Sequence, residues 1–286
     1  MRLVLGLAAF AAALVATSAY ADEAEIHTFH CIDGCPMGTA GTNDLIVREI
    51  YTLSSNDRTR FADWVAYRVT STTVGQSGSR GWQADPWLAD SETLEPDDYN
   101  DAPAALGIDR GHQAPLAAFS GTPTASDTNI LSNITPQSSD LNQASWQYLE
   151  AQERDYVGRP GPNGRARILY VLTGPLYERV MPPLPMPAGR ERHRVPSGYW
   201  KIIRDENGGL SAFIFDQATT RTADYCDMRV PLEDVELRTN LTFFPRLIER
   251  RFSSLDTELG CPLPPGVSAA QPTPPGRDRA RARPRP

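Results

Sequence analysis

Short apolar segments separated by long polar loops constrain the fold of this chain most strongly. Residues 61–70 alternate between apolar and polar side chains, as a half-buried strand does. Three further β-rich runs follow at residues 168–173, 199–203 and 210–215, with a turn expected at 207–209. No interior run reaches the roughly 18 apolar residues that a membrane-spanning helix needs. The pattern predicts a single α+β domain with a mixed or antiparallel central sheet, flanked by helices and long loops.

Two helices are expected from the periodicity. The longer covers residues 139–157, where Ser139 or Asp140 can cap the start and Pro160 ends the helix. Its apolar face consists of Leu141, Trp146, Leu149 and Tyr156. The shorter helix begins at Pro231, a residue type favoured at the first helical position, and continues to Leu237.

The N-terminal 21 residues have the features of a secretory signal peptide. Arg2 precedes an apolar run over residues 3–16, and Ala19-Tyr20-Ala21 has the small-x-small pattern of a cleavage site. We expect cleavage after Ala21, a secreted or periplasmic protein, and no membrane span in the mature form. The alternative is a membrane anchor, which the missing stop-transfer flank disfavours.

The C-terminal segment differs from the body in composition. Residues 262–286 contain eight prolines and five arginines without apolar periodicity, which predicts a disordered tail. The tail is either a solvated extension that aids solubility or a non-specific tether to phosphates or cell surfaces. The body between the two ends, residues 22–261, is then the folded domain. Its 34 acidic and 22 basic residues argue, on composition alone, against a nucleic-acid partner.

The chain contains four cysteines: Cys31, Cys35, Cys226 and Cys261. An even number in an exported protein predicts two disulfides, and three pairings are possible. The natural partition joins the first two cysteines and the last two, so that the second bridge closes the end of the domain onto its body. The alternative is a zinc site that adds His27 and His30 to the first two cysteines. No zinc-finger spacing supports it, and oxidation would consume the thiols.

Side chains suited to phosphodiester chemistry concentrate between residues 109 and 154. The run Asp109-Arg110-Gly111-His112 follows a short apolar stretch, and Asn142, Glu150 and Arg154 lie on the longer predicted helix. On an α-helix these three can point into one cleft. An imidazole can take a proton from water, a carboxamide can hold a hard cation, and a guanidinium can meet phosphate oxygens. The plainer alternative is a structural histidine, a helix-start asparagine and an ordinary Glu–Arg pair.

Longer stretches resemble the DNA/RNA non-specific endonuclease family. They are DRGHQAPLAAF, SNITPQSSDLNQASWQYLEAQER and YVLTGPLYER, supported by WVAYRVT and SRGWQADP. The resemblance runs from about Cys31 to Cys261 and is greatest to the secreted Serratia-type members. It implies a ββα-metal active site and a metal-dependent phosphodiester hydrolase that cleaves DNA and RNA to 5′-phosphorylated fragments. It also implies a homodimer.

The resemblance also assigns roles to individual residues. His112 corresponds to the general base. Asn142 corresponds to the direct ligand of a single Mg²⁺, which Mn²⁺ can replace, and Glu150 to the carboxylate that holds the ion through water. Arg80 corresponds to an arginine near the scissile phosphate. Arg154 and Asn133 correspond to further phosphate-contacting or site-supporting positions. Of the two residues beside the base, Asp109 is expected to contact the metal-bound waters from behind, and Arg110 to be structural or to face the phosphate.

These assignments reverse the inference from composition, because binding depends on where charges lie. We expect a positive groove of Arg80, Arg110, Arg154 and Mg²⁺ on an acidic body. We also expect Gly111 to let the backbone turn sharply beside His112. Two other functions stay open: a catalytically silent polyanion-binding module of the same fold, and a phosphatase-type esterase.

Overall fold

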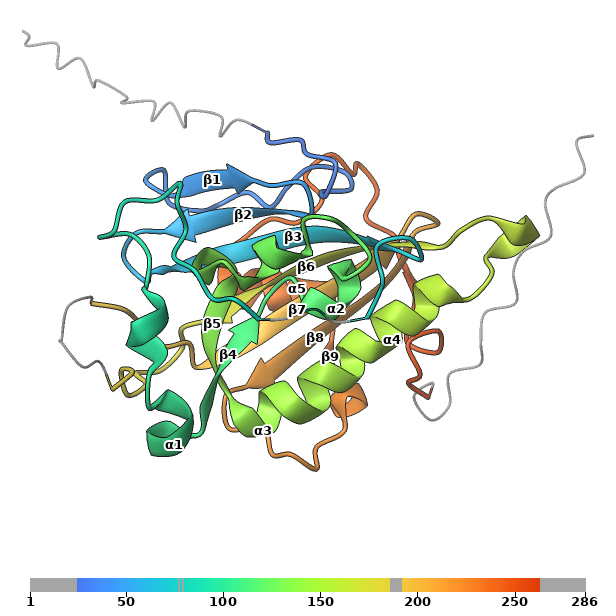
Figure 1. Cartoon of the computed structure of the whole chain (residues 1–286). Coiled ribbons are helices and arrows are strands. Elements are labelled where there is room, and N and C mark those ends of the chain that lie inside the picture. The colour runs from blue at the N-terminus through green and yellow to red at the C-terminus, as the bar shows by residue number, and fades with distance from the viewer. Residues whose placement is uncertain (1–24, 77, 79, 186–191, 263–286) are drawn as a thin grey trace, which may run out of the picture.

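The computed structural model describes residues 25–76, 78, 80–185 and 192–262. The predicted signal peptide and, apart from Pro262, the predicted tail lie outside these residues. One mixed sheet forms the centre, with strand order β1-β2-β3-β6-β7-β8-β10 and β9 paired to β8 (Figure 1). Neighbouring strands are antiparallel, apart from the parallel pair of β10 and β8. The α+β architecture predicted from the sequence is confirmed.

The sheet strands have the following bounds: β1 Asp44–Val47, β2 Tyr51–Asn56, β3 Phe61–Thr70, β6 Ile168–Leu176, β7 Gly198–Asp205, β8 Gly209–Asp216, β9 Arg229–Val230 and β10 Ser253–Ser254. Four of them overlap the four runs expected from the sequence, and β1, β2, β9 and β10 were not anticipated. The turn that joins β7 to β8 covers residues 206–208, one residue earlier than expected.

Side chains on β3 divide between the two faces of the sheet. Val65 and Tyr67 belong to an apolar cluster with the long helix, whereas Trp64 and Ala66 belong to a second cluster on the other face. Both faces are covered, so the prediction of a half-buried strand at 61–70 was wrong. The apolar-polar alternation misled because Tyr67 and its neighbours are buried beneath the helix rather than exposed to water.

Strand β6 continues beyond the expected run at 168–173, through Gly174 and Pro175 to Leu176. Pro175 is tolerated because β3 pairs with β6 only as far as Thr173, so this part of β6 has β7 as its neighbour in the sheet. Gly174 is required by close packing, since a Cβ atom there would lie 2.3 Å from the Asp63 carbonyl oxygen.

One helical segment crosses one face of the sheet, and a shorter helix covers the other (Figure 1). The long segment comprises α3 Ser139–Leu141, a π-helical turn Asn142–Trp146 and α4 Gln147–Gly158. Its predicted apolar face is buried as expected. Neither Ser139 nor Asp140 caps it; Ser138 occupies the cap position without a side-chain hydrogen bond. The shorter helix, α5 Leu232–Thr239, has Pro231 as its cap rather than as its first residue.

A two-stranded antiparallel sheet lies beside the long helical segment. It pairs β4 Ile108–His112 with β5 Ile134–Ser138, and β5 leads directly into α3. Strand, strand and helix therefore form a ββα unit. Short helices fill the connections around it: η1 Pro96–Tyr99, α1 Ala102–Leu106, α2 Leu116–Phe119, η2 Ala125–Asn129 and η3 Leu131–Asn133. Two others lie elsewhere: η5 Pro162–Gly164 and η6 Tyr225–Met228.

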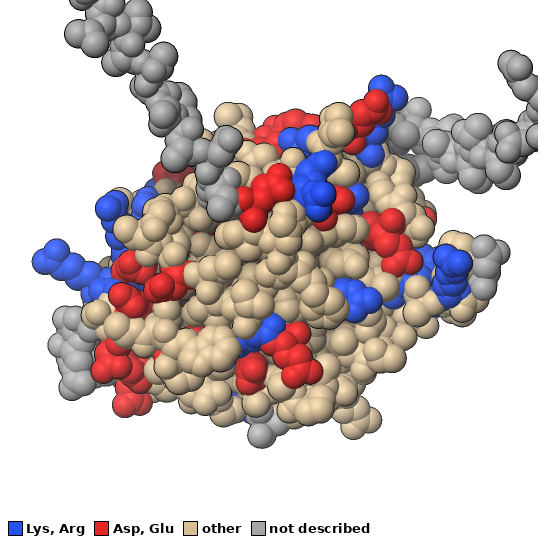
Figure 2. Space-filling model, turned by 90° about the horizontal axis from the view of Figure 1, so that it is seen from above, with Lys and Arg blue, Asp and Glu red and all other residues tan. Residues whose placement is uncertain are grey.

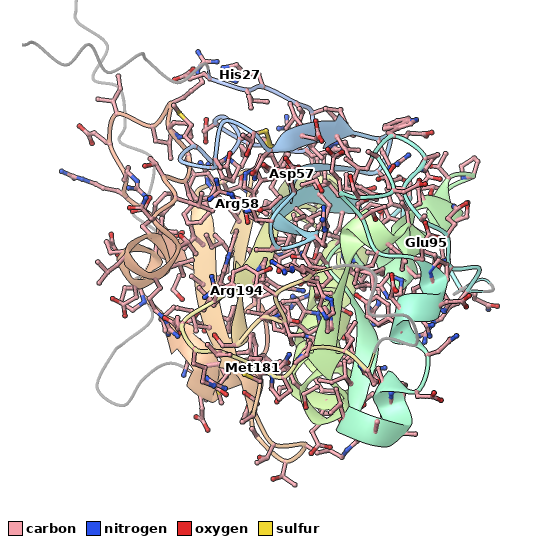
Figure 3. All side chains as sticks on the ribbon, turned by 90° about the vertical axis from the view of Figure 1, so that its left-hand side faces the viewer. His27, Asp57, Arg58, Glu95, Met181 and Arg194 are labelled. Carbon is pink, nitrogen blue, oxygen red and sulfur yellow. A yellow bond between two sulfur atoms is a disulfide. The ribbon has the colours of Figure 1, made fainter. Side chains whose placement is uncertain are left out.

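A third apolar cluster holds the ββα unit against the sheet. Ile134 of β5 packs there with Phe61 of β3, and with Leu184 and Val195 from the loop between β6 and β7. Figure 3 shows Met181 and Arg194 on this loop. Arg194 ties it down by donating hydrogen bonds to the carbonyl oxygens of Thr59 and Tyr177. The loop thus has a packing role beside the ββα unit.

Both expected disulfides are present, Cys31–Cys35 and Cys226–Cys261. The chain has no free cysteine, so the zinc alternative was wrong. Instead of facing a metal with the cysteines, His30 is buried and its ring contacts Thr52 and the Glu49 carbonyl oxygen. Among the described residues, no helix has the length and apolarity needed to cross a membrane.

We expect the two disulfides to differ in their contribution to stability. Cys226 and Cys261 are 35 residues apart, against 4 for the other pair, and a longer loop loses more entropy in the unfolded state when it is closed. Replacing both Cys226 and Cys261 by Ser should lower the free energy of unfolding by about 3–4 kcal/mol. Urea unfolding followed by circular dichroism measures this. The matched double variant of Cys31 and Cys35 should lose about 2 kcal/mol, and an equal or larger loss there would contradict the argument.

Candidate active site

A cleft of about 520 Å³ opens between the ββα unit and the loop that carries Arg80 and Trp82. Seven of the eight residues predicted from the sequence to form the site line this cleft: Arg80, Asp109, Arg110, His112, Asn142, Glu150 and Arg154. They come from three separate segments of the chain. Asn133 is the eighth and lies behind the lining, fully buried.

Strand β4 supplies three of these residues, Asp109, Arg110 and His112. Gly111 lies within this strand and has no positive φ, so the predicted sharp turn beside His112 was wrong. A glycine is needed at position 111 for close packing instead. A Cβ atom at Gly111 would lie 2.6 Å from the Cβ of Gln137 on β5.

Asp109 orients the side chain of Asn142. The Asn142 amide nitrogen donates to Asp109 Oδ2 over 2.9 Å, and Ser139 Oγ donates to Asp109 Oδ1 over 2.7 Å. Gln143 also donates to Oδ2. With its nitrogen engaged, Asn142 keeps its amide oxygen without a hydrogen bond from the described residues, at the lining of the cleft. A carboxamide oxygen in that position is a ligand suited to a hard cation.

His112 is held through one ring nitrogen. Its Nε2 lies 3.0 Å from Oδ1 of the buried Asn129, so Nε2 carries the hydrogen and donates it. This tautomer leaves Nδ1 with a lone pair. Burial lowers the pKa of His112 to about 4, the Asn129 hydrogen bond opposes this, and the positive charge of Arg80 adds to it. The imidazole is therefore neutral, and able to accept a proton, over a wider pH range than an ordinary histidine.

Glu150 faces the cleft from the first turn of α4, with a side chain 12% exposed. Burial raises its pKa to about 7, and the positive charge of Lys201 limits the rise. The repulsion from Glu153 acts in the same direction as burial. Asn142 and Glu150 both reach the cleft although the π-helical turn between them changes the angle expected from a regular α-helix.

The three arginines of the cleft have different surroundings. Arg80 is exposed, and Arg154 is partly buried beside Glu150. Arg110 donates to the Pro96 carbonyl oxygen over 2.8 Å, and its guanidinium lies 5.4 Å from the ring centroid of Trp82. Arg110 is thus largely committed to holding the wall of the cleft.

Asn133 supports the site from behind. Its side chain accepts from the Ala114 backbone nitrogen and donates to the Ala114 and Thr128 carbonyl oxygens. These bonds fix the segment that follows His112. A phosphate contact by Asn133 is excluded by its burial, so of the two roles expected for it, only support agrees with the structure.

Sequence reasoning missed two residues of the site, Asn129 and Trp82. Trp82 lines the cleft, with its ring centroid 5.3 Å from that of His112. Trp82 lies within one of the stretches that carry the family resemblance, and Asn129 lies three residues before another. No spacing rule singles them out, because their contacts depend on how the loops fold back onto β4.

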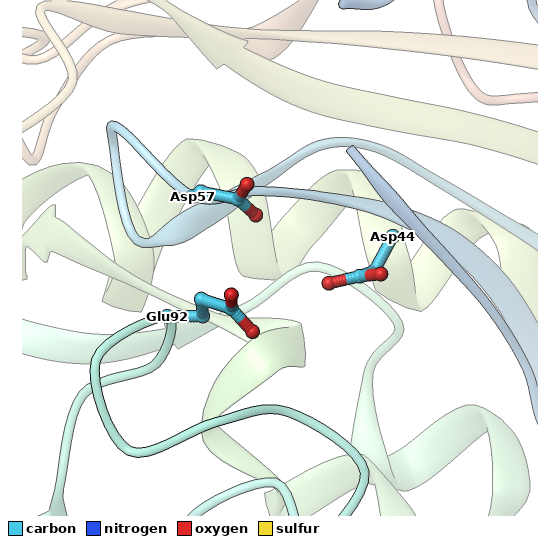
Figure 4. A group of neighbouring side chains, drawn as sticks. All are labelled: Asp44, Asp57 and Glu92. Carbon is cyan, nitrogen blue, oxygen red and sulfur yellow. The ribbon is translucent and has the colours of Figure 1, made fainter. Parts of the chain in front are cut away.

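A second group of carboxylates lies outside the cleft. Asp44, Asp57 and Glu92 have carboxylate oxygens within 4.8 Å of one another, and Figure 4 shows the three side chains converging. Burial, followed by the charges of Glu92 and Asp57, raises the pKa of Asp44. Exposed acidic groups of this kind are common without a bound ion. We assign the cluster no role.

Comparison with known proteins identifies the family. The family model described as DNA/RNA non-specific endonuclease matches residues 33–249. This chain belongs to that family. It is 44% identical to a nuclease of Serratia marcescens over 264 residues, which cover 91% of this chain and 96% of the relative. It is 29% identical to mitochondrial endonuclease G of Homo sapiens, with 74% of this chain and 73% of the relative covered.

The fold of this endonuclease also has a solved counterpart. A chain from the crystal structure of the EndoG/EndoGI complex superimposes with a TM-score of 0.62 at 22% sequence identity, covering 76% of this chain and 92% of that one. At this identity the likeness concerns the fold. Acidic and basic side chains are interspersed over the face seen in Figure 2, without a continuous basic area. Three cationic residues line the cleft itself, beside two acidic ones.

We expect Asn129 to control the orientation of His112. Replacing Asn129 by Ala removes the acceptor for Nε2–H and leaves the ring free to rotate, which should lower kcat by about one to two orders of magnitude with little change in KM. Initial rates on a fluorescence-quenched oligonucleotide measure both parameters. Asn100→Ala is the control, because Asn100 is exposed and hydrogen-bonded locally to Asp97. An Asn129→Ala enzyme with unchanged kcat would remove this role.

Proposed function

We propose that this chain is an exported, Mg²⁺-dependent endonuclease that hydrolyses DNA and RNA without sequence preference and leaves 5′-phosphorylated ends. Its nuclease activity and metal dependence are properties of the family. We propose in addition that the metal is Mg²⁺, that the residues of the cleft have the roles described below, and that the chain is exported. The observation that carries it is the convergence of seven residues in one cleft, with the Asn142 oxygen left free by Asp109.

The residues of the cleft fit a hard divalent cation. Asn142 would bind it directly through the amide oxygen, and Glu150 would hold it through water. Oxygen donors of this kind, few in number and partly hydrated, suit Mg²⁺ better than Zn²⁺, which favours thiolate and imidazole. When bound, the cation would stabilise negative charge on the phosphate oxygens and on the leaving O3′.

His112 would act as the general base. Its neutral ring, fixed by Asn129 at Nε2, can take a proton from the attacking water at Nδ1. The exposed guanidinium of Arg80 would contact the scissile phosphate, and Arg154 would add positive charge deeper in the cleft. These contacts involve phosphate rather than base edges, so they carry no sequence information. A site that neither requires nor excludes a 2′-hydroxyl accepts both DNA and RNA.

We infer that the chain has three parts: a signal peptide at 1–21, a nuclease domain at 22–261 and a Pro/Arg-rich tail at 262–286. The two disulfides support passage through an oxidising compartment, whether the destination is the periplasm or the medium. A homodimer stays a prediction.

A plasmid-nicking assay with and without Mg²⁺ tests the proposal. His112→Ala should lower the rate by about 10²–10⁴-fold with the fold intact by circular dichroism. Asn142→Ala should impair cleavage strongly and raise the Mg²⁺ concentration needed for half-maximal rate. Normal cleavage in excess chelator would contradict the metal role. Two further outcomes would favour the alternatives: binding without nicking, for a silent polyanion-binding module, or turnover of a small phosphomonoester alone, for a phosphatase-type esterase.

Metal binding should depend on pH through Glu150 and not through His112. The raised pKa of Glu150, about 7, means that this carboxyl is increasingly protonated as pH falls below 7, whereas His112 stays neutral to near pH 4. Mg²⁺ affinity should therefore fall by about five- to tenfold for each pH unit below 7. Isothermal titration calorimetry between pH 5 and 8 measures this. Glu150→Gln should bind more weakly and with a flat profile; a wild-type midpoint near pH 4 would refute the assignment.

A further inference from the structure

Lys201 is the only lysine in the chain. The sequence has 28 Lys and Arg residues, and the other basic residues are all arginines. Lys201 lies near the middle of β7, which pairs with β6 on one side and β8 on the other, and its side chain is fully buried. Where the protein needs a positive charge elsewhere, on the surface or in the cleft, it uses a guanidinium. The only side-chain ammonium group lies beneath Glu150, which lines the cleft.

The ammonium group is surrounded by side chains of β3 and the long helical segment. Lys201 Nζ lies 2.9 Å from Glu153 Oε1, 3.7 Å from Glu150 Oε1 and 3.4 Å from the Tyr67 hydroxyl. It also lies 4.3 Å from the ring centroid of Trp146. A compact point charge fits this enclosure, whereas a planar guanidinium needs more room and a wider set of acceptors.

Glu153 and Glu150 both form ion pairs with Lys201, but their surroundings differ. Glu153 is fully buried and is satisfied by Lys201 on one oxygen and by the Tyr67 hydroxyl, 2.9 Å away, on the other. Glu150, one turn earlier on α4, lines the cleft, and its ion pair with Lys201 is the only one it makes within the described part of the chain. Without Lys201, two carboxylates one turn apart would face each other and repel.

We propose that Lys201 is a positioning residue for the cation site, acting through Glu150. It sets where the Glu150 carboxylate stands and keeps it beside Glu153, so that its cleft-facing side can hold the water shell of the metal. This inference rests on the proposed function of Glu150. A group that orients a metal-binding side chain commonly changes metal affinity by about 10–100-fold when it is removed.

Mg²⁺ affinity of Lys201→Met, measured by isothermal titration calorimetry, tests the inference. The methionine side chain has similar length without the charge, and we expect binding at least about tenfold weaker than in the wild type. Arg204→Met is the matched control. Arg204 lies on the same strand and is also buried, but it packs against Phe244 and pairs with Asp33 on the other face of the sheet. Its loss should lower stability and leave Mg²⁺ affinity within about twofold, because it does not contact Glu150.

A double-mutant cycle separates positioning from general destabilisation. If Lys201 acts through Glu150, Lys201→Met should have no further effect on Mg²⁺ affinity in a Glu150→Gln background. Equal losses in both backgrounds would overturn the inference, as would wild-type affinity in a folded Lys201→Met protein. Absence of Mg²⁺ binding by the wild type would instead contradict the proposed function itself.

A variant that does not fold leaves a second measurement on the intact protein. With ¹³C-labelled lysine, the enzyme gives one Cε signal, which belongs to Lys201 because the sequence has no other lysine. Mg²⁺ titration should shift this signal with the same midpoint as the calorimetric isotherm, and should not shift it in Glu150→Gln. An unmoved signal in wild-type protein that binds Mg²⁺ would overturn the inference.

Discussion

A buried ion pair between the long helical segment and the sheet is the contact on which the rest of the structure depends. Glu153 on α4 meets Lys201 on β7, and the Tyr67 hydroxyl from β3 completes the network. Removing two charges from water is unfavourable unless they are paired and hydrogen-bonded, so this contact permits few other placements of the helix. Apolar packing by Leu149 and Tyr156 drives the helix onto the sheet, and the charge pair determines its position. The cleft depends on that position, because the same segment carries Asn142, Glu150 and Arg154, which line it.

A second link joins the helix to the small sheet. Asp109 on β4 accepts hydrogen bonds from Ser139 and Asn142, which begin the helical segment. It therefore connects the strand that carries His112 to the helical segment that carries Asn142 and, in the same contact, engages the Asn142 amide nitrogen.

Much of this arrangement follows from local sequence. The apolar runs at 61–70 and 199–203 predicted β3 and β7, and the helical face of Leu141 to Tyr156 predicted the segment over the sheet. Three features of the structure could not be predicted from the local sequence. Strands β4 and β5 are short and pair across 21 intervening residues, so their register depends on loops that no periodicity describes. Asn129 reaches His112 only after such a loop folds back. Net charge misled because it averages over the surface, while the arginines of the cleft lie together.

The solitary lysine has a practical consequence for observing this enzyme. A lysine-specific protease has one possible cutting site in the whole sequence, and that site lies inside the sheet beneath α4. Cutting there requires β7 to separate from its neighbours, so its rate reports opening of the catalytic core. An arginine-specific protease, by contrast, meets exposed targets such as Arg58 and Arg221 and reports the motion of surface segments. The two reagents together divide the unfolding of the protein into its outer and inner steps.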